Sequence, residues 1–555
     1  MKKRYLRLGV QQLFFVLLLV GWIPIVSWAQ SPSDAAFLAS LGELREATYS
    51  DKEKIVAQLI DSGHPNVKAA LTALLEDRLY YRNDDQKVFL VKTVAQEDST
   101  TLNLIDPLTL KSAGSASVDS LTKIGTNNGL RRVLQTNLAR FGLSSADPST
   151  RLSAARDLER NLDEGNIQLL REQYAKERDS GVKAELATGL ALAALDGTDG
   201  AARFAAVSTL RHSVRQDVLN KLQGLLEKSP DGSFVESDAR VRAAAASAVT
   251  AINRWRSFYS GVQTLFFGCS LGSVLVLISI GLAITFGVMG VINMAHGELM
   301  MLGAYATYVV QTAMPNHTEA SIFVAIPVAF AVAALMGILI ERTIIRFLYG
   351  RPLETLLATF GVSLILQQLV RSIFTALNRE VITPAWMSGT LQLNDALSIT
   401  YNRLYIVVFT LLVFAALLLV LKRTRMGLEI RAVAQNRAMA RAMGIRSDWV
   451  DAMTFGLGSG IAGVAGVALS QLTNVNPNLG QSYIIDSFMV VVFGGVGNVW
   501  GALVGGLSMG VVNELLEPYA GAVLAKIVVL VALILFIQTR PRGLFPPVGR
   551  ASENQ

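Results

Sequence analysis

The stretch that decides the fold reads FGVMGVINMAHGE and occupies residues 286–298, directly after a long apolar run. Its three glycines free the backbone from regular helix, and the N–H and C=O groups released in this way need partners. Such backbone persists at membrane depth only where it lines a cavity or is buried in protein. Polar side chains are costly at this depth, so Asn293, His296 and Glu298 are candidates for a solute path. The alternatives are a structural hydrogen-bond cluster and a short loop at the interface.

Apolar segments continue on both sides of this stretch. They lie at 262–286, 297–313, 321–341, 353–376, 403–421, 452–472, 483–515 and 522–539. No Lys or Arg occurs between Arg256 and Glu341. Long, nearly charge-free runs are typical of membrane-spanning helices, because about 20 residues cross the hydrocarbon core. The sequence therefore predicts an all-α fold class, with residues 258–548 forming a polytopic membrane domain of about eight helices with glycine-broken segments.

A second glycine-rich interruption reads FGGVGNVWG and occupies residues 493–501. Paired interruptions in two halves of a chain are a sequence pointer to a translocation site. We therefore add Gly494, Gly495 and Asn498 to the predicted solute path. Tight helix packing through small residues is the alternative explanation for these glycines.

The distribution of basic residues predicts the topology. Clusters at 342–351, 422–446 and 540–550 mark cytoplasmic loops by the positive-inside rule. Eight complete spans from an external residue 257 would leave the tail, 549–555, outside, against this rule. The conflict disappears if the broken segment 483–515 crosses the membrane twice, or enters and leaves on one side.

The largest basic cluster, at 422–446, also has helical periodicity. One predicted face carries Ile430, Val433, Ala434 and Ala438. Gly444 suits the end of such a helix, because glycine readily adopts the left-handed conformation found there. An amphipathic helix between two spans fits a groove on a partner protein. A helix that lies on anionic lipid is the alternative.

The first part of the chain has a different character. Residues 1–29 match a secretory signal peptide, with a basic start, a short apolar core and a small-residue cleavage site. An uncleaved first helix is the alternative, and in both cases residues 30–257 are expected on the periplasmic side. Helical patterns recur there with a period of about 30 residues, which predicts a soluble HEAT-like domain. Its expected role is binding or docking, with plain scaffolding as the alternative.

Local signals refine this prediction for residues 30–257. Asp147 and Asp179 are expected to open helices, because aspartate is a preferred N-cap residue. The helical pattern is interrupted between residues 80 and 125. Within that interval, Val88–Val91 could form a strand, whereas Lys111–Ser120 is expected to be a Ser-rich loop.

The composition excludes several classes of protein. Of the 555 residues, 51% are hydrophobic and the mean hydropathy is +0.41, which excludes a disordered chain and argues against an ordinary soluble enzyme. The formal charge of +7 comes from the leader and from loops beside apolar segments, so nucleic-acid binding is not indicated. The single cysteine, Cys269, excludes an intrachain disulfide. We expect no catalytic residues, no metal site and no cofactor.

Four motifs in order carry a family resemblance over residues 258–548. GVINMAHGE at 290–298 resembles the signature of permeases in the branched-chain amino-acid and urea class of ABC importers. RAVAQN at 431–436, followed by MGI at 443–445, is similar to the cytoplasmic coupling segment of that family. VVFGGVGN at 491–498 and RPRGLF at 540–545 resemble its later glycine-rich segment and its tail. Within the class, the long helical extension before the first span resembles the urea ABC transporter permease subunits.

The resemblance implies a mechanism and a set of partners. The implied activity is import of urea or short amides across the bacterial inner membrane by ATP-driven alternating access. The implied partners are a second permease subunit, two ATP-binding subunits and a periplasmic substrate-binding protein. The chain has no GxxxxGK[ST] motif, so ATP hydrolysis is expected on the partner subunits. The resemblance places ATPase coupling on Glu429, Arg431, Ala432, Gln435, Asn436 and Gly444.

Three other functions stay open at this point. Import of branched-chain amino acids lies within the same class of permeases. A passive urea channel with an extracellular scaffold, and an envelope scaffold without transport, belong to other classes. The neutral donors and acceptors of Asn293, His296 and Asn498 suit urea, whereas a zwitterionic amino acid favours charge pairing or a helix N-terminus.

Overall fold

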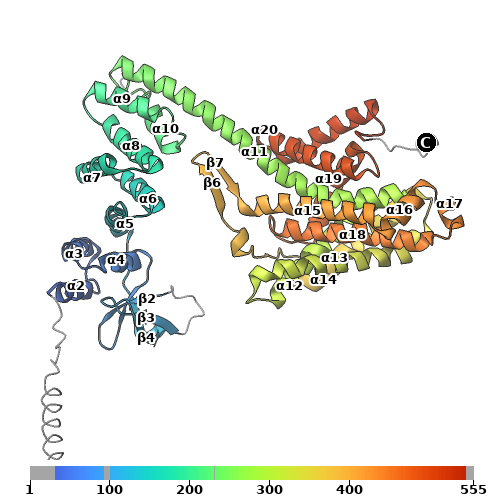
Figure 1. Cartoon of the computed structure of the whole chain (residues 1–555), viewed down its shortest axis with the longest axis horizontal. Helices are drawn as coiled ribbons and strands as arrows, with labels where there is room; N and C mark the ends of the chain where they lie inside the picture. Colours follow the sequence, from blue (N-terminus) through green and yellow to red (C-terminus); the bar gives the residue numbers. More distant parts are fainter. Residues whose placement is uncertain (1–31, 93–100, 231, 546–555) are drawn as a thin grey trace, which may run out of the picture. The chain divides into compact units, whose positions relative to one another are not determined.

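The computed structural model describes residues 32–92, 101–230 and 232–545 (Figure 1). The expected signal peptide and the whole predicted tail, 549–555, lie outside the described residues. The chain divides into two compact units. Unit 1 extends to Ser213 and includes Asn220–Val249, and unit 2 comprises Val214–Leu219 and the chain from Thr250 onward.

Helices make up most of unit 1. They are α2 (Pro32–Glu43), α3 (Tyr49–Asp61), α4 (Val67–Leu75), α5 (Asn128–Gly142), α6 (Pro148–Glu159), α7 (Glu164–Lys176), α8 (Ser180–Leu195) and α9 (Gly200–Leu210). Two further helices, α10 (Gln216–Gly224) and α11 (Ala239–Met289), contain residues of both units. The predicted helix starts are confirmed, because the side chains of Asp147 and Asp179 accept backbone N–H groups at the beginnings of α6 and α8.

A small antiparallel sheet separates α4 from α5. Its strands are β1 (Leu79–Arg82), β2 (Val88–Val91), β3 (Thr101–Ile105), β4 (Ser112–Ser117) and β5 (Leu121–Lys123), in the order β4-β3-β2-β1-β5. The predicted strand Val88–Val91 is confirmed. The Ser-rich loop expected at Lys111–Ser120 is wrong, because its centre pairs with β3, and the all-α class is wrong for this region. Small polar residues hide the strand from pattern reasoning, since backbone hydrogen bonds to β3 form without an apolar alternation.

Two buried ion pairs repeat along the helices of unit 1. Arg151 donates to Glu177 at 2.8 and 2.9 Å, and Arg203 donates to Glu236 at 2.7 and 2.9 Å. Arg151 lowers the pKa of Glu177 to about 2 through these hydrogen bonds, and Arg203 lowers the pKa of Glu236. The partners are 26 and 33 residues apart. A repeated contact of this spacing fits the predicted period, while the HEAT-like assignment stays a prediction.

Unit 2 contains the remaining helices, most of which are apolar. After α11 they are α12 (His296–Ala313), α13 (Thr318–Thr343), α14 (Pro352–Phe374), α15 (Tyr401–Arg423), α16 (Arg425–Gln435), α17 (Arg437–Ala442), α18 (Ser447–Ser470), α19 (Leu479–Gly494) and α20 (Val499–Thr539). A hairpin of β6 (Thr390–Asn394) and β7 (Leu397–Thr400) precedes α15. Within the described part of the chain, six helices are long and apolar enough to cross a membrane: α11, α13, α14, α15, α18 and α20.

The predicted interruption of segment 483–515 is confirmed. Helix α19 ends at Gly494 and α20 begins at Val499, so the segment forms two helices. Helix α20 is itself kinked, because Gly521 has φ +75° and ψ 160°.

Contacts of the chain after α20 and of the end of α11 define one face of unit 2. The N–H of Leu544 donates to the carbonyl of Phe493 at 2.9 Å, which fixes the chain after α20 to the end of α19. Gly287, near the end of α11, packs against Gly497, and its neighbour Val288 packs against the buried apolar cluster of α16, α17 and α18. The end of α20 therefore returns to the face that carries the basic helices α16 and α17. We call this the basic face.

Helix α18 packs closely between α12 and α13. A Cβ on Gly303 of α12 would lie 2.5 Å from the Cα of Gly463 on α18, so the two backbones approach more closely than any side chain would allow. Close approach through small residues is typical of helix pairs in membranes. Helix α18 is consequently buried along most of its length.

Candidate functional site

The first glycine-rich stretch forms a break between α11 and α12. Gly290 has φ +66°, and residues 290–295 are not helical. His296, the first residue of α12, lies beside Ile278, which is 11 residues before the end of α11. Eleven helical residues span about 16 Å. Helix α12 therefore starts alongside the last part of α11, about 16 Å before the end of that helix and inside the thickness of the spanning helices.

Asn293 and His296 are completely buried at this break. The Nε2 atom of His296 lies 2.9 Å from the carbonyl oxygen of Ile278, and a carbonyl only accepts, so Nε2 donates. The Oδ1 atom of Asn293 accepts the N–H of Ala295 at 3.0 Å. Among the described residues, Nδ1 of His296 and Nδ2 of Asn293 have no partner. Buried polar atoms without partners are uncommon, so these two atoms are candidates for contact with a solute.

Glu298 is 1% exposed and faces α14. Its Oε1 atom accepts hydrogen bonds from Ser363 Oγ at 3.0 Å and from Gln367 Nε2 at 2.7 Å. Its Oε2 atom has no partner in the part of the chain that the structure describes. The carboxyl group is thus held in a fixed orientation by one oxygen, while the other is free to accept an N–H group.

The partners on α14 belong to a row of polar side chains that sequence reasoning missed. The row consists of Thr355, Thr359, Ser363, Gln367 and Arg371, which are four residues apart along the helix. A four-residue spacing places side chains on one helical face, so the signal was present in the sequence. Thr359 accepts the N–H of Met294 at 3.1 Å, and Arg371 donates to Asn478 at 2.6 Å. The row therefore faces the break between α11 and α12.

The second glycine-rich stretch forms a tight turn at the basic face. The side chain of Asn498 accepts the N–H groups of Trp500 and Gly501 at 3.0 and 3.2 Å, and so caps α20. Gly495 has φ +103°, and Gly494 packs directly against the backbone of Gly501. The structure brings this turn to the end of α11, but no hydrogen bond between described residues joins it to Asn293, His296 or Glu298.

The predicted coupling segment consists of two helices rather than one. Helix α16 ends at Gln435, and the side chain of Asn436 accepts the N–H of Met439 at 2.9 Å, which starts α17. The break arises because Asn436 has extended backbone angles and is a strong N-cap residue. Gly444 ends the segment with φ +89°, as predicted.

The predicted buried face of this segment is only partly correct. Ile430 and Val433 are buried, but Ala434, in the same helix, is exposed, and Ala438 is exposed because it lies beyond the break at Asn436. Glu429 and Ala432 are half-buried, whereas Gln435 is exposed.

Arginines fix these two helices to the membrane domain. Arg431 donates to the carbonyl of Leu421 in α15, and Arg437 binds the buried carboxylate of Asp451 in α18. Glu429 accepts a hydrogen bond from Arg425 at 3.0 Å. The outer surface of the two helices carries exposed apolar side chains: Leu428, Met439 and Met443. This exposed apolar surface with a basic rim can bind a partner protein.

Comparison with known proteins assigns the family. The sequence profile described as "Branched-chain amino acid transport system / permease component" matches residues 264–537. The permease protein LivH of Escherichia coli is 33% identical over 294 residues, which cover 51% of this chain and 94% of LivH. The permease protein BraD of Pseudomonas aeruginosa is 33% identical over 296 residues, or 52% of this chain and 96% of BraD.

More distant relatives extend the comparison. The ribose import permease protein RbsC of Haemophilus influenzae is 25% identical over 296 residues, or 47% of this chain and 81% of RbsC. No solved structure matches the chain. The match to LivH covers nearly the whole of that protein, and the matched helices of this chain are those that span the membrane. The chain therefore belongs to the family of permease components of branched-chain amino acid transport systems, as a multi-pass inner-membrane protein.

Proposed function

We propose that the chain is the permease subunit of an ABC importer that carries urea or short amides across the inner membrane. The proposed complex contains a second permease subunit, two ATP-binding subunits and a periplasmic substrate-binding protein. ATP binding and hydrolysis by the partners drive alternating access in the permease pair. Family membership supports the permease role, and the substrate class rests on the chemistry of the buried site.

The observation that carries the substrate proposal is the half-satisfied carboxyl group of Glu298. One of its oxygens is free to accept an N–H group, and nearby Asn293 and His296 offer an amide donor and a ring nitrogen without partners. Urea presents N–H donors and a carbonyl acceptor in one small neutral molecule. A site with free donors and acceptors on both sides suits such a solute, because each buried polar atom then gains a partner.

The turn at Gly494, Gly495 and Asn498 completes the proposed path at the basic face. It lies against the end of α11, which is continuous with the break that holds Asn293. A displacement of this turn would be transmitted to α11 through the backbone contact between Gly287 and Gly497. We therefore assign the turn to the inner mouth of the passage rather than to solute recognition.

The helices α16 and α17 form the proposed docking surface for the ATP-binding subunits. Their exposed apolar side chains supply the area, and basic residues surround it. Arg431 anchors α16 to α15 and Arg437 anchors α17 to α18, so movement of a docked partner reaches the spanning helices, while Asn436 caps the start of α17. Ala432, Gln435 and Gly444 belong to the same segment, and Glu429 orients Arg425 at its rim. By the positive-inside rule this face is cytoplasmic.

Unit 1 is proposed to lie in the periplasm as a HEAT-like docking domain. The matched regions of LivH and BraD account for about half of this chain, and the family profile begins at residue 264. The helical unit therefore precedes the shared permease region. A helical unit on the side where substrate arrives is placed to receive the binding protein.

Import of branched-chain amino acids is the second candidate, because LivH and BraD are described as branched-chain amino acid permeases. Reconstitution of the complete complex in vesicles separates the two. We expect ATP-dependent uptake of labelled urea that excess leucine leaves unchanged. Uptake of leucine without uptake of urea would establish the second candidate instead. Urea flux that persists without ATP would indicate a passive channel.

A further inference from the structure

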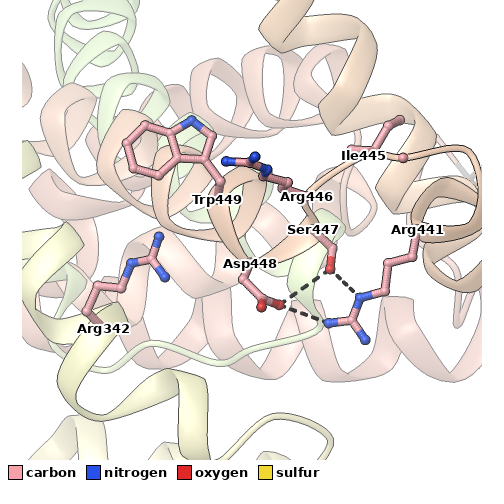
Figure 2. A pocket seen from close by; sticks show the side chains of 8 residues that line it. Arg342, Arg441, Ile445, Arg446, Ser447, Asp448 and Trp449 are labelled. Atoms are coloured by element: carbon pink, nitrogen blue, oxygen red, sulfur yellow. Dashed lines mark hydrogen bonds and ion pairs between the residues drawn. The ribbon is translucent and has the colours of Figure 1, made fainter.

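A pocket of about 510 Å³ opens on the basic face, beside the start of α18. Arg342 contributes from the end of α13, and residues 441 and 444–449 contribute from the connection between α17 and α18. Figure 2 shows the side chains of Arg342, Arg446 and Trp449 around one opening. The lining contains three arginines and a single aspartate, so its formal charge is positive.

Part of this charge is neutralised within the pocket. Arg441 donates to Asp448 at 2.9 Å and to Ser447 at 2.6 Å (Figure 2). The Nε atom of Arg342 lies 3.6 Å from Oε2 of its neighbour Glu341, which makes a long ion pair. The side chain of Arg446 makes no hydrogen bond or ion pair with the residues that the structure describes. Arg342 and Arg446 therefore offer guanidinium donors to an anion in the pocket.

The surroundings of the pocket match a membrane interface. It lies where two predicted spans, α13 and α18, end at the basic face. Trp449 is 56% exposed, and the guanidinium of Arg342 lies 5.9 Å from the centre of its ring. Phe347, in the turn after α13, and Leu353, in the first turn of α14, are 71% and 81% exposed. Exposed tryptophan and basic residues together are typical of the headgroup level of a bilayer.

We propose that this pocket binds the phosphate of an anionic membrane phospholipid such as phosphatidylglycerol. Arg342 and Arg446 donate hydrogen bonds to the phosphate oxygens, which match the planar guanidinium geometry. Trp449 lies along the glycerol and the upper acyl chain. Gly444 leaves one side open, since nothing lies within 4 Å of the position that a Cβ would occupy there. The pocket adjoins the docking surface of α16 and α17, because Arg441 belongs to α17, but the apolar side chains of Leu428 and Met439 do not line it.

Fluorescence of Trp449 provides a local test in vesicles that contain the full chain. Dibrominated phosphatidylglycerol or dibrominated phosphatidylcholine is mixed at increasing fractions into unlabelled lipid. The difference between the native chain and Trp449→Phe isolates the signal of Trp449. We expect half-maximal quenching at a markedly lower fraction of the anionic lipid than of the zwitterionic one.

Variants inside and outside the pocket distinguish specific binding of an anionic lipid from general electrostatic attraction of such lipids to the basic face. Arg446→Gln should raise the fraction needed for half-quenching about fivefold, which corresponds to about 1 kcal/mol for one basic residue at a membrane surface. Arg446→Lys should retain most of the preference. Arg423→Gln removes the same charge from the same face outside the pocket and should leave the preference unchanged.

Three results would overturn the proposal. The first is equal quenching by both lipids in the native chain. The second is an equal loss in Arg446→Gln and Arg423→Gln, which would indicate a diffuse basic surface. The third is relief of quenching by soluble glycerol phosphate or inorganic phosphate, which would identify a site for free phosphate instead of lipid.

Discussion

Gln367→Leu tests whether the row of polar side chains on α14 positions Glu298 for the solute. The substitution conserves approximate volume and removes the donor that lies 2.7 Å from Oε1 of Glu298. A hydrogen bond to an ionised or buried carboxyl group contributes about 1.5–3 kcal/mol. If transport depends on the orientation of Glu298, urea uptake should fall about tenfold to 100-fold, at about 1.4 kcal/mol per factor of ten.

A double-substitution cycle with Glu298→Gln gives the coupling directly. Initial rates of ATP-dependent urea uptake are measured in reconstituted vesicles for the native complex, each single variant and the double variant. We expect a coupling energy of about 1 kcal/mol, because Gln367→Leu removes the hydrogen bond that Glu298→Gln weakens by taking away the charge of the acceptor. Thermal unfolding and ATP hydrolysis are measured alongside, so that a folding defect is distinguished from a transport defect.

The neighbouring residue provides a matched control. Gln368 is exposed on a different face of α14, and Gln368→Leu makes the same chemical change without touching Glu298. It should leave uptake unchanged. Strictly additive effects of Gln367→Leu and Glu298→Gln, or an equal loss in Gln368→Leu, would refute the assignment of Gln367 as a positioning residue.

Three further predictions concern stability and coupling. The pKa of Glu177 is held at about 2 in the folded state by Arg151, below its usual 4.5, so its stabilisation is complete above pH 4.5 and lost as the pH falls toward 2. Thermal unfolding of Glu177→Gln, followed by circular dichroism, should therefore depend less on pH between 5 and 3 than that of the native chain. Gly303→Ala should lower the unfolding temperature in detergent, because overpacking costs about 1–3 kcal/mol. Replacement of both Glu429 and Arg431 by Ala should reduce ATP-coupled uptake while membrane insertion stays normal.

Each of these three has its own contrary outcome. A pH dependence of unfolding that is identical in Glu177→Gln and the native chain would show that the ion pair contributes no acid sensitivity. An unchanged melting temperature for Gly303→Ala would mean that α12 and α18 separate at no cost. Normal coupled uptake by the variant lacking Glu429 and Arg431 would contradict the docking role of α16.

The six helices that are long and apolar enough to span the membrane were predictable because each one carries its signal locally, whereas the predicted segment 297–313 became α12, which is not among them. An apolar run of sufficient length specifies a span without reference to other residues. The interruption at residues 494–498 was predictable for the same reason, since glycines and a capping asparagine act on their own backbone. The strand Val88–Val91 also carried its own apolar pattern, whereas β4 forms only through pairing with β3 and carried none.

The site was predictable only in part, because its contacts join distant residues. Glu298 was identified from its own depth in an apolar region. Its partners Ser363 and Gln367 lie 65 and 69 residues away, and only folding shows that they face it. The polar row on α14 could have been found from its four-residue spacing. The residues that the row contacts in the folded protein could not have been found in this way. Likewise, the side chain of Asn436 can either cap a new helix or lie within one continuous helix. Hydrophobic periodicity does not distinguish between these two conformations.

The deep start of α12 has a consequence for how the protein is made. Helix α12 has 18 residues, carries His296 and Glu298 in its first turn, and is not among the six sufficiently apolar helices of the described chain. On its own it would partition poorly from the translocon into lipid, because polar and ionisable groups at membrane depth oppose insertion. It must therefore enter the bilayer together with α11, whose Ile278 binds His296, and with α14, whose Ser363 and Gln367 bind Glu298. A nascent chain cut off directly after α12 should leave that helix outside the membrane, and continued synthesis through α14 should draw it in.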